Sequence, residues 1–434
     1  MSTPSLLNIP YVIKDGTLYS QIPETGAGDF VVTRATTPTA NRSTRVNANG
    51  FIELVNDNVP RLDYPLGGAV NGCPALLVEP AATNLALQSE AIGTSPWGTS
   101  NATVTANAIS SPDNNLTADQ INYTANTSSR VFQTIASSNS ATYTYSVFIK
   151  NNTFLTGELV LLRFENNLAA PNDFEIRAVI DPTNIGAATF SLIGTAGTGT
   201  SGTVSGSVQD YGNGWWRVRV TGTSGTAAAN ATANIRIQQS SSVIARSLYA
   251  WGVQLEVGSV ATSYIPTTTV AIARASDVIR KTSITSLLGQ SEGTVYFEVE
   301  VTDEARDKWF CTLDSSITSF IQMWVNPTRQ ISARINNSGT IVVSTLTSSV
   351  LTLGYHKVAF AYNTATNGCI MYVDGVQNPA TTRTVGSPGL PAFNNMTFGG
   401  YIAGITESIK AHVRAGAVYP NRLSNSELAT LTTP

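Results

Sequence analysis

Apolar and polar side chains alternate with a period of two along most of this chain, which is the pattern of half-buried β-strands. In TVYFEVEV, for example, Val295, Phe297, Val299 and Val301 share one face. The same alternation predicts strands at TYTYSVFI (Tyr143, Tyr145, Val147 and Ile149 on one face), WWRVRVTGT (Trp216, Val218 and Val220) and LYAWGVQLE (Tyr249, Trp251, Val253 and Leu255). Because Trp251 is in phase with Val253 and Leu255, we expect it in the same core. Helical periodicity is almost absent, so the pattern predicts an all-β protein made of β-sandwich (jelly-roll) domains.

Turn and cap signals lie between these strands. YGNGWW at 211–216 and INNSGTI at 335–341 predict β-hairpins, because Asn-Gly and Ser-Gly pairs suit two-residue turns. One helix is predicted near the end of the chain, from Ser424 to Leu431, where Ser424 is a candidate N-cap and Glu427 follows it three residues later.

The chain has 434 residues, which is too long for one compact core. Residues 1–88 contain several prolines and few long strands, and predict an extended arm that a partner protein completes. Residues 89–270 carry one set of strands and predict a first sandwich. After a linker at 271–290, residues 291–434 predict a second sandwich.

Charged residues make up 12% of the chain, against roughly 25% in an average soluble domain. The net charge of −3 and the absence of a Lys/Arg cluster argue against a nucleic-acid partner. The beginning of the chain lacks a secretory signal, and no apolar run is long enough to cross a membrane, so we expect no membrane insertion. Cys73, Cys311 and Cys369 are scattered, which favours small buried side chains in a reducing cytoplasm over a metal or redox site.

Five segments carry a more specific pattern: FVVTRATTPTANRSTRVNANGFIELVNDNVPRLDYP, GCPALLVEPAATNLALQSE, GNGWWRVRV, LYAWGVQLEVGSVATSYIPTTT and ARASDVI. Together these segments resemble phage tail-fibre and head-fibre proteins. The middle unit resembles a carbohydrate-binding-module jelly roll. The last third resembles a laminin-G or concanavalin-A-like sandwich through EGTVYFEVEV, GYHKVAFAYNTATNGCIMYVDGVQ and AGAVYPNRLSNSELATL. The resemblance implies a homotrimer, and it does not distinguish a head fibre from a tail fibre.

The sequence offers little catalytic chemistry, and we expect no catalytic residue, no metal and no cofactor. Only His356 and His412 are present, and neither a G-x-S-x-G elbow nor a phosphate-binding loop occurs. His356 is in phase with Val358 and is expected at the end of a buried strand face. Glu298 and Glu300 alternate as the acidic pair of a glycosidase does, but the segment is better explained as a solvated strand face.

Glycan binding commonly uses exposed aromatic rings that stack on sugars. The candidate glycan-contact residues are Trp309, Trp324, Trp97, Tyr211 and Trp215, although core or turn packing is the commoner role for each. Asp374 in YVDGV is predicted to be a hairpin-turn residue before Gly375 rather than a calcium ligand.

These observations predict a non-enzymatic subunit of a bacteriophage virion appendage, a fibre or spike assembled in the bacterial cytoplasm. It would bind other virion proteins through residues 1–88 and host-surface polysaccharide through its sandwiches. Two alternatives stay open: a purely structural capsid or tail decoration protein without a ligand, and a polysaccharide depolymerase.

Overall fold

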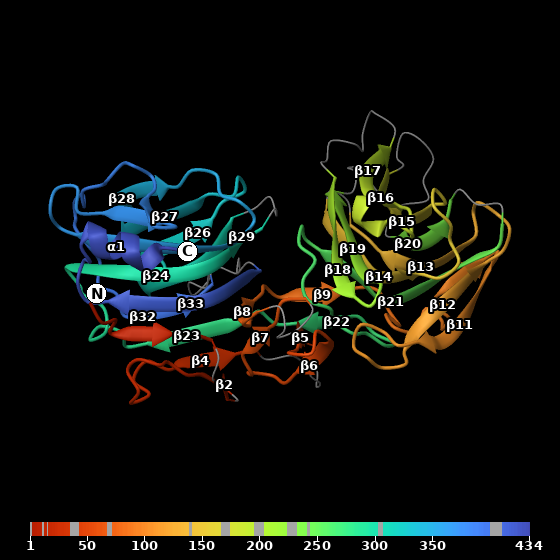
Figure 1. Cartoon of the computed structure of the whole chain (residues 1–434), viewed down its shortest axis with the longest axis horizontal. Helices are drawn as coiled ribbons and strands as arrows, with labels where there is room; N and C mark the ends of the chain where they lie inside the picture. The colour runs from red at the N-terminus through yellow and green to blue at the C-terminus, as the bar shows by residue number, and fades with distance from the viewer. Residues whose placement is uncertain are drawn as a thin grey trace.

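The computed structural model describes residues 2–10, 13–14, 16–34, 43–66, 72–138, 141–165, 174–194, 204–223, 232–240, 244–302, 307–399 and 410–434. Within these ranges the strands pair in antiparallel sheets, which confirms the predicted all-β class. Figure 1 shows two lobes side by side, of which one holds both ends of the chain and the other holds the middle of the sequence. Each lobe is a β-sandwich.

The C-terminal sandwich packs an eight-stranded sheet against a nine-stranded sheet. The first sheet has the order β31 (Val376–Gln377), β30 (Ile370–Val373), β29 (Gly354–Asn363), β24 (Glu292–Val301), β33 (Ala411–Tyr419), β8 (Ala75–Val78) and β7 (Arg61–Asp63), and β1 (Leu6–Asn8) also pairs with β33. The second has the order β2 (Ile13–Lys14), β3 (Thr17–Leu18), β4 (Phe30–Thr33), β23 (Val278–Thr282), β32 (Asn395–Phe398), β25 (Lys308–Ser316), β26 (Ser319–Val325), β27 (Ile331–Asn337) and β28 (Thr340–Thr347). Between them lies an apolar core that includes Val295, Phe297, Val299 and Val301, the face predicted from TVYFEVEV.

The N-terminal segment differs from the extended arm that we expected for residues 1–88. Most of its described strands, namely β1 to β4, β7 and β8, belong to the two sheets of the C-terminal sandwich, as the red and orange arrows of Figure 1 show. Leu6 lies opposite Val418 in β33, and Phe30 and Leu76 are fully buried in the core. The segment therefore completes the C-terminal sandwich of its own chain, and its strands pair within that chain rather than with a partner protein. Its strands have two to four residues, too few for a period-two pattern to be recognised.

The expected linker at 271–290 also contains strands. β22 (Ile272–Arg274) pairs with β9 (Ala82–Asn84), and β23 pairs with both β4 and β32. The connection between the two sandwiches is thus built from paired strands of both the N-terminal segment and the predicted linker. β5 (Ser43–Val46) and β6 (Ile52–Val55) form a small separate sheet beside it.

The middle sandwich packs two six-stranded sheets against each other. One has the order β10 (Gly98–Ser100), β13 (Arg130–Ala136), β20 (Thr232–Gln239), β15 (Val160–Glu165), β16 (Phe174–Ile180) and β17 (Thr189–Gly194). The other has the order β11 (Ala102–Ile109), β12 (Ala118–Tyr123), β21 (Arg246–Val257), β14 (Thr142–Asn151), β19 (Trp215–Thr223) and β18 (Ser205–Gly212). Its core contains Tyr143, Tyr145, Val147 and Ile149, and also Val218 and Val220, which confirms both predicted faces.

Trp251 is buried, but in a different cluster from the one predicted. Val253 and Leu255 lie in the core of the middle sandwich, whereas Trp251 packs outside it against Phe148 and Tyr264. A β-bulge causes the change of face: the register between β14 and β21 shifts here, and Gly252 has φ +63°. Strict alternation cannot continue through such a bulge, so the assignment of Trp251 to the same face was wrong.

A buried ionic network lies at the junction of the two sandwiches. Arg34, Arg61 and Arg274 surround Glu79 and Asp277, and all five side chains are buried. The Arg34 Nη1 atom is 2.7 Å from Asp277 Oδ1, and the Arg61 Nη1 atom is 2.8 Å from Glu79 Oε2. Arg61 also pairs with Asp277. Buried charges of this kind are tolerated only when they are paired and hydrogen-bonded.

The network brings together motifs that lie far apart in the sequence. Its residues come from FVVTR, VPRLDYP, LLVEPAATN and ARASDVI, four pieces of the segments that resemble phage fibre proteins. Burial alone would raise the pKa of Glu79, but Arg61 and Arg274 hold that pKa well below its usual range. We call these five side chains, Arg34, Arg61, Glu79, Arg274 and Asp277, the junction network.

Local predictions at the turns and the helix are confirmed. α1 runs over Asn425–Thr432 with Ser424 as its N-cap and Glu427 completing a capping box, and it packs on the outer face of the eight-stranded sheet. Asn213 and Gly214, both with positive φ, form the turn between β18 and β19. Asp374 begins the predicted turn between β30 and β31.

The three cysteines are free. Cys311 and Cys369 are buried in the core of the C-terminal sandwich, as expected. Cys73 is exposed, in contrast to the prediction, because it lies in the irregular stretch before β8 rather than on a strand.

Candidate functional site

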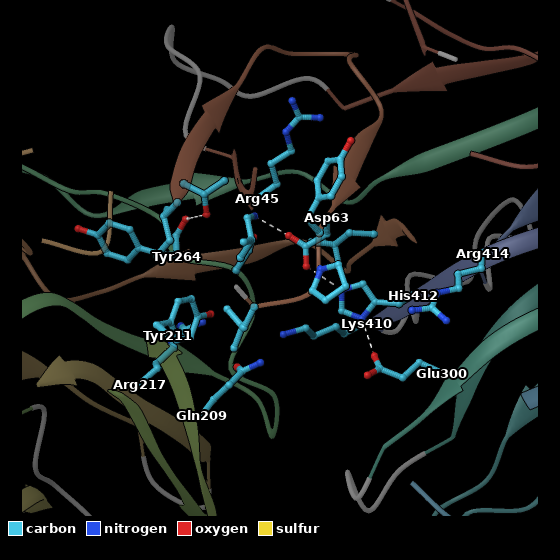
Figure 2. A pocket seen from close by; sticks show the side chains of 18 of the residues that line it. Arg45, Asp63, Gln209, Tyr211, Arg217, Tyr264, Glu300, Lys410, His412 and Arg414 are labelled. Carbon is cyan, nitrogen blue, oxygen red and sulfur yellow. Dashed lines mark hydrogen bonds and ion pairs between the residues drawn. The ribbon is translucent and has the colours of Figure 1, made fainter. Parts of the chain in front are cut away.

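A cleft lies between the two sandwiches, just beside the junction network, and charged side chains from both sandwiches line it. It has two lobes of about 290 Å³ each, and Gln209, Glu300, Lys410 and His412 line both. The first lobe is further lined by Arg45, Asp63, Tyr211, Arg217, Tyr264, Tyr355 and Arg414, and the second by Arg219, Thr302 and Leu353, among others. Residues of the N-terminal segment, the middle sandwich and the C-terminal sandwich therefore meet here (Figure 2).

A row of three titratable side chains forms one wall of the cleft. Figure 2 shows His412, on β33, between Asp63 of β7 and Glu300 of β24. The His412 Nδ1 atom is 2.7 Å from Glu300 Oε2, and its Nε2 atom is 2.9 Å from Asp63 Oδ2. The other carboxylate oxygen of Asp63 accepts a hydrogen bond from the Val46 amide at 2.6 Å. The row ties three separate segments together.

The two carboxylates fix the charge of the histidine. Burial alone would lower the pKa of His412, but Glu300 and Asp63 raise it to about 10. Burial would raise the pKa of Glu300, and the charge of His412 instead brings it below its usual value. At neutral pH the imidazole of His412 is therefore protonated and the Glu300 carboxyl group is ionised. Neither group has the intermediate pKa of a general acid–base catalyst.

Cationic side chains surround this row. Arg217 donates to the Thr262 carbonyl at 2.8 Å and to the Ser146 hydroxyl at 3.0 Å, both of which are neutral. The Arg414 guanidinium lies 3.5 Å from the centre of the Tyr355 ring. Lys410 is held loosely, since its Nζ atom is 3.5 Å from the Ala261 carbonyl and 3.9 Å from Glu79.

One of the five predicted glycan-contact residues lies in the cleft. Tyr211 is half-buried in its wall, and its ring packs edge-on against Phe148 with the ring centres 4.8 Å apart. Trp97 and Trp215 are buried instead, and their indole N–H groups donate to the carbonyls of Leu87 and Ser110, each at 3.0 Å. These two tryptophans serve packing, so they are unsuited to stack on a sugar.

The remaining two predicted residues form a pair elsewhere. Trp309 of β25 lies directly opposite Trp324 of β26, and both are half-buried on the outer face of the nine-stranded sheet. The Arg334 guanidinium lies over Trp324, 5.4 Å from its ring centre, and donates to Gln322 at 2.9 Å. The sheet thus presents aromatic, guanidinium and amide groups together, on the face that points away from the core.

The acidic strand Glu298–Glu300 is not the solvated face that the sequence suggested. Glu300 contacts His412 in the cleft, and Glu298 lies 3.6 Å from Arg414. The alternation was read correctly, but no pattern in the sequence reveals that β33 supplies cationic partners. His356 is buried, as predicted, and its Nδ1 atom lies 2.5 Å from Asp374.

Sequence reasoning missed the cleft itself. His412 and Arg414 alternate on β33, with Lys410 directly before that strand in the same phase, and Arg217 and Arg219 alternate on β19. These two alternating sets of cations were the available signal. Charged side chains that alternate on one strand usually face solvent. These two sets line a cleft only because the two sandwiches pack side by side. Among the described residues, no group of three or more His, Cys, Asp or Glu side chains is placed to hold a metal ion. No helix within the described ranges is long and apolar enough to span a membrane.

No family model matches the chain, and no curated protein matches its sequence. Solved structures resemble about a third of it. The CBM40 of the Ruminococcus gnavus IT-sialidase, solved bound to α2,6-sialyllactose, is 13% identical, with 35% of this chain and 91% of that chain covered and a TM-score of 0.30. A heptameric SAP-like pentraxin from Limulus polyphemus is 15% identical, with 32% and 69% covered and a TM-score of 0.27. Botulinum neurotoxin type C, whose cell entry depends on two ganglioside molecules, is 12% identical, with 36% and 39% covered and a TM-score of 0.30.

Proposed function

We propose that the chain is a non-enzymatic subunit of a bacteriophage virion appendage that binds host-surface glycans in the cleft between its sandwiches. One observation carries the proposal: the motifs that resemble phage fibre proteins meet at the junction network, and this junction holds the two sandwiches so that the cleft forms. The resemblance therefore concerns the residues that build the cleft, and not only the strands of a common fold.

The charge state of the cleft supports binding rather than hydrolysis. A glycosidase needs a carboxylic acid whose raised pKa keeps it protonated near neutral pH. The pKa of Glu300 is lowered instead, and the protonated His412 cannot accept a proton. The depolymerase alternative is therefore disfavoured by this wall of the cleft.

The proposal includes a homotrimer and attachment to other virion proteins through the N-terminal segment. Since most of the described strands of residues 1–88 are part of the C-terminal sandwich, attachment would use the outer surface of that sandwich and not a free arm. Several copies on one particle would multiply weak individual glycan contacts, because bound copies keep the others at high effective concentration.

The test is binding of the full-length protein to bacterial surface glycans on an array, with its oligomeric state measured in parallel. We expect selective binding that is lost when Gln209 and Tyr211 are replaced together by Ala. A protein that stays folded and binds no surface glycan would overturn the proposal in favour of a decoration protein without a ligand. Release of new reducing ends from the glycan would favour a depolymerase.

A further inference from the structure

We infer that the cleft is selective for an anionic saccharide, one that carries a carboxylate or a phosphate group on the sugar. The inference rests on the proposed function and names the ligand class of the same site. The shared chemistry is an oxyanion beside several hydroxyl groups, which guanidinium, ammonium and amide donors recognise together.

The first argument is the distribution of charge. The chain as a whole is acidic, with 28 Asp and Glu against 25 Lys and Arg. The two lobes of the cleft reverse this balance, with six cationic side chains against the two carboxylates of Asp63 and Glu300. The six are Arg45, Arg217, Arg219, Lys410, His412 and Arg414.

An excess of cations persists when the ion-pair partners of the lining residues are included. Arg45 pairs with Glu53 and Arg414 approaches Glu298, which neutralises two of the six cations outside the lining. The junction network behind the cleft adds no negative charge, because its three arginines outnumber its two carboxylates. The protein walls of the cleft have a low dielectric constant, so they concentrate the electric field of these cations on a ligand inside the cleft.

The second argument is that particular donors are available. Lys410 lines both lobes, and its two contacts of 3.5 and 3.9 Å are long for an ammonium group. In Figure 2 its side chain extends into the space between the sandwiches, towards the side from which Gln209 projects. An ammonium, an amide and the phenol of Tyr211 thus face the same hollow from both sandwiches.

The third argument is size. Each lobe measures about 290 Å³, at the lower end of the roughly 300–1,000 Å³ of small-molecule sites. This volume suits a single sugar residue better than a long segment. Since four lining residues are common to both lobes, adjacent sugars of one chain can occupy them with the anionic group near Lys410.

The experiment measures binding of the full chain to three polysaccharides: polygalacturonate, which carries carboxylates, teichoic acid, which carries phosphates, and neutral dextran. The variants are Lys410→Met and Arg219→Gln. Lys281→Met is the matched control, because Lys281 lies on β23 outside the lining of the cleft. Thermal melting confirms that each variant is folded, and Arg219→Gln keeps the test valid if loss of Lys410 disturbs the junction network.

We expect at least one anionic polymer to bind, dextran not to bind, and each cleft variant to bind at least tenfold more weakly while Lys281→Met is unchanged. The polymer that binds identifies carboxylate or phosphate as the group recognised. Equal binding of dextran, or binding to neutral glycans only on the array, would overturn the anionic selectivity and leave the proposed function standing. Equal losses for Lys281→Met and the cleft variants would show non-specific charge attraction and overturn the inference. Failure to bind any glycan would overturn both the anionic selectivity and the proposed function.

Discussion

Arg61 and Asp277 are 216 positions apart in the sequence and form an ion pair that is almost completely shielded from water. Arg61 belongs to β7 in the N-terminal segment, and Asp277 directly precedes β23 in the predicted linker. Their pairing, together with Arg34, Glu79 and Arg274, joins the two segments that connect the sandwiches. We therefore expect the position of the two sandwiches around the cleft to depend on charges that do not line it.

Replacing Arg61 by Met tests this dependence. The variant leaves Glu79 and Asp277 buried with fewer cationic partners, and removal of one member of a buried ion pair typically costs about 3–5 kcal/mol. We expect urea denaturation to show a loss of this size. Arg45→Met is the control, because Arg45 pairs with Glu53 at the surface, and we expect a loss of at most about 1 kcal/mol. Equal losses in the two variants would contradict a special role for the junction network.

Deletion of residues 1–88 is expected to unfold the C-terminal sandwich. The deletion removes β1, β4, β7 and β8 and with them the buried side chains of Leu6, Phe30 and Leu76, which leaves apolar core open to water. We expect the 89–434 fragment to aggregate, as measured by its soluble fraction and by circular dichroism.

A fragment of residues 82–270 is the matched control for this deletion. It keeps β9, where the Asn84 amide donates to the carbonyls of Val253 and Ile265. It also keeps the core of the middle sandwich, and we expect it to be soluble and to melt cooperatively. A soluble, native-like 89–434 fragment would mean that residues 1–88 are dispensable to the fold, as an arm would be.

The contrast between these two fragments shows what the sequence can and cannot reveal. Long strands such as Glu292–Val301 were predicted with the correct inward face, and the capping box at Ser424 located α1. The strands of residues 1–88 were missed because β2 and β3 have only two residues each. Such strands exist through pairing with distant partners, and local periodicity carries no information about those partners.

The candidate site was predictable only in part, for a related reason. Tyr211 was selected because aromatic rings that lie near loops, and are exposed there, commonly stack on sugars, and it lies in the cleft. Trp97 and Trp215 met the same criterion but are buried, because the position of a ring near a loop does not indicate which side of the sheet it occupies. His412 was set aside as an isolated histidine, and its two carboxylates come from strands 112 and 349 positions away.

The bulge at Gly252 makes a further prediction about stability. An added Cβ at this position would meet Phe148 Cδ2 at 2.9 Å, and φ is +63°, which disfavours any side chain. We expect Gly252→Ala to destabilise the middle sandwich by about 2–4 kcal/mol, of which roughly 1–2 kcal/mol is backbone strain. Gly157→Ala is the control, since its φ is +83° but no atom lies within 4 Å, so it reports the backbone cost alone. Equal losses would show that the contact with Phe148 is unimportant.

The row Asp63–His412–Glu300 makes the stability of the folded protein depend on pH. The pKa of His412 is raised from 6.5 to about 10 in the folded protein. The folded state therefore binds a proton that the unfolded state releases above about pH 6.5. This stabilisation is complete below about pH 6.5 and is lost as the pH rises towards 10. Each pKa unit corresponds to roughly 1.4 kcal/mol, and screening by solvent reduces the total to on the order of 2 kcal/mol.

Urea denaturation of the full chain between pH 6.5 and 9.5 measures this loss, with His412→Gln as the comparison. Gln can still hydrogen-bond with Glu300 and Asp63 but carries no charge, so we expect the variant to be less stable at pH 6.5 and to approach the wild type at pH 9.5. Other groups that titrate in this range affect both proteins equally, and the difference between the two curves therefore isolates His412. Parallel curves would mean that the histidine is not protonated between its carboxylates, and the excess of cations in the cleft would then be smaller by one.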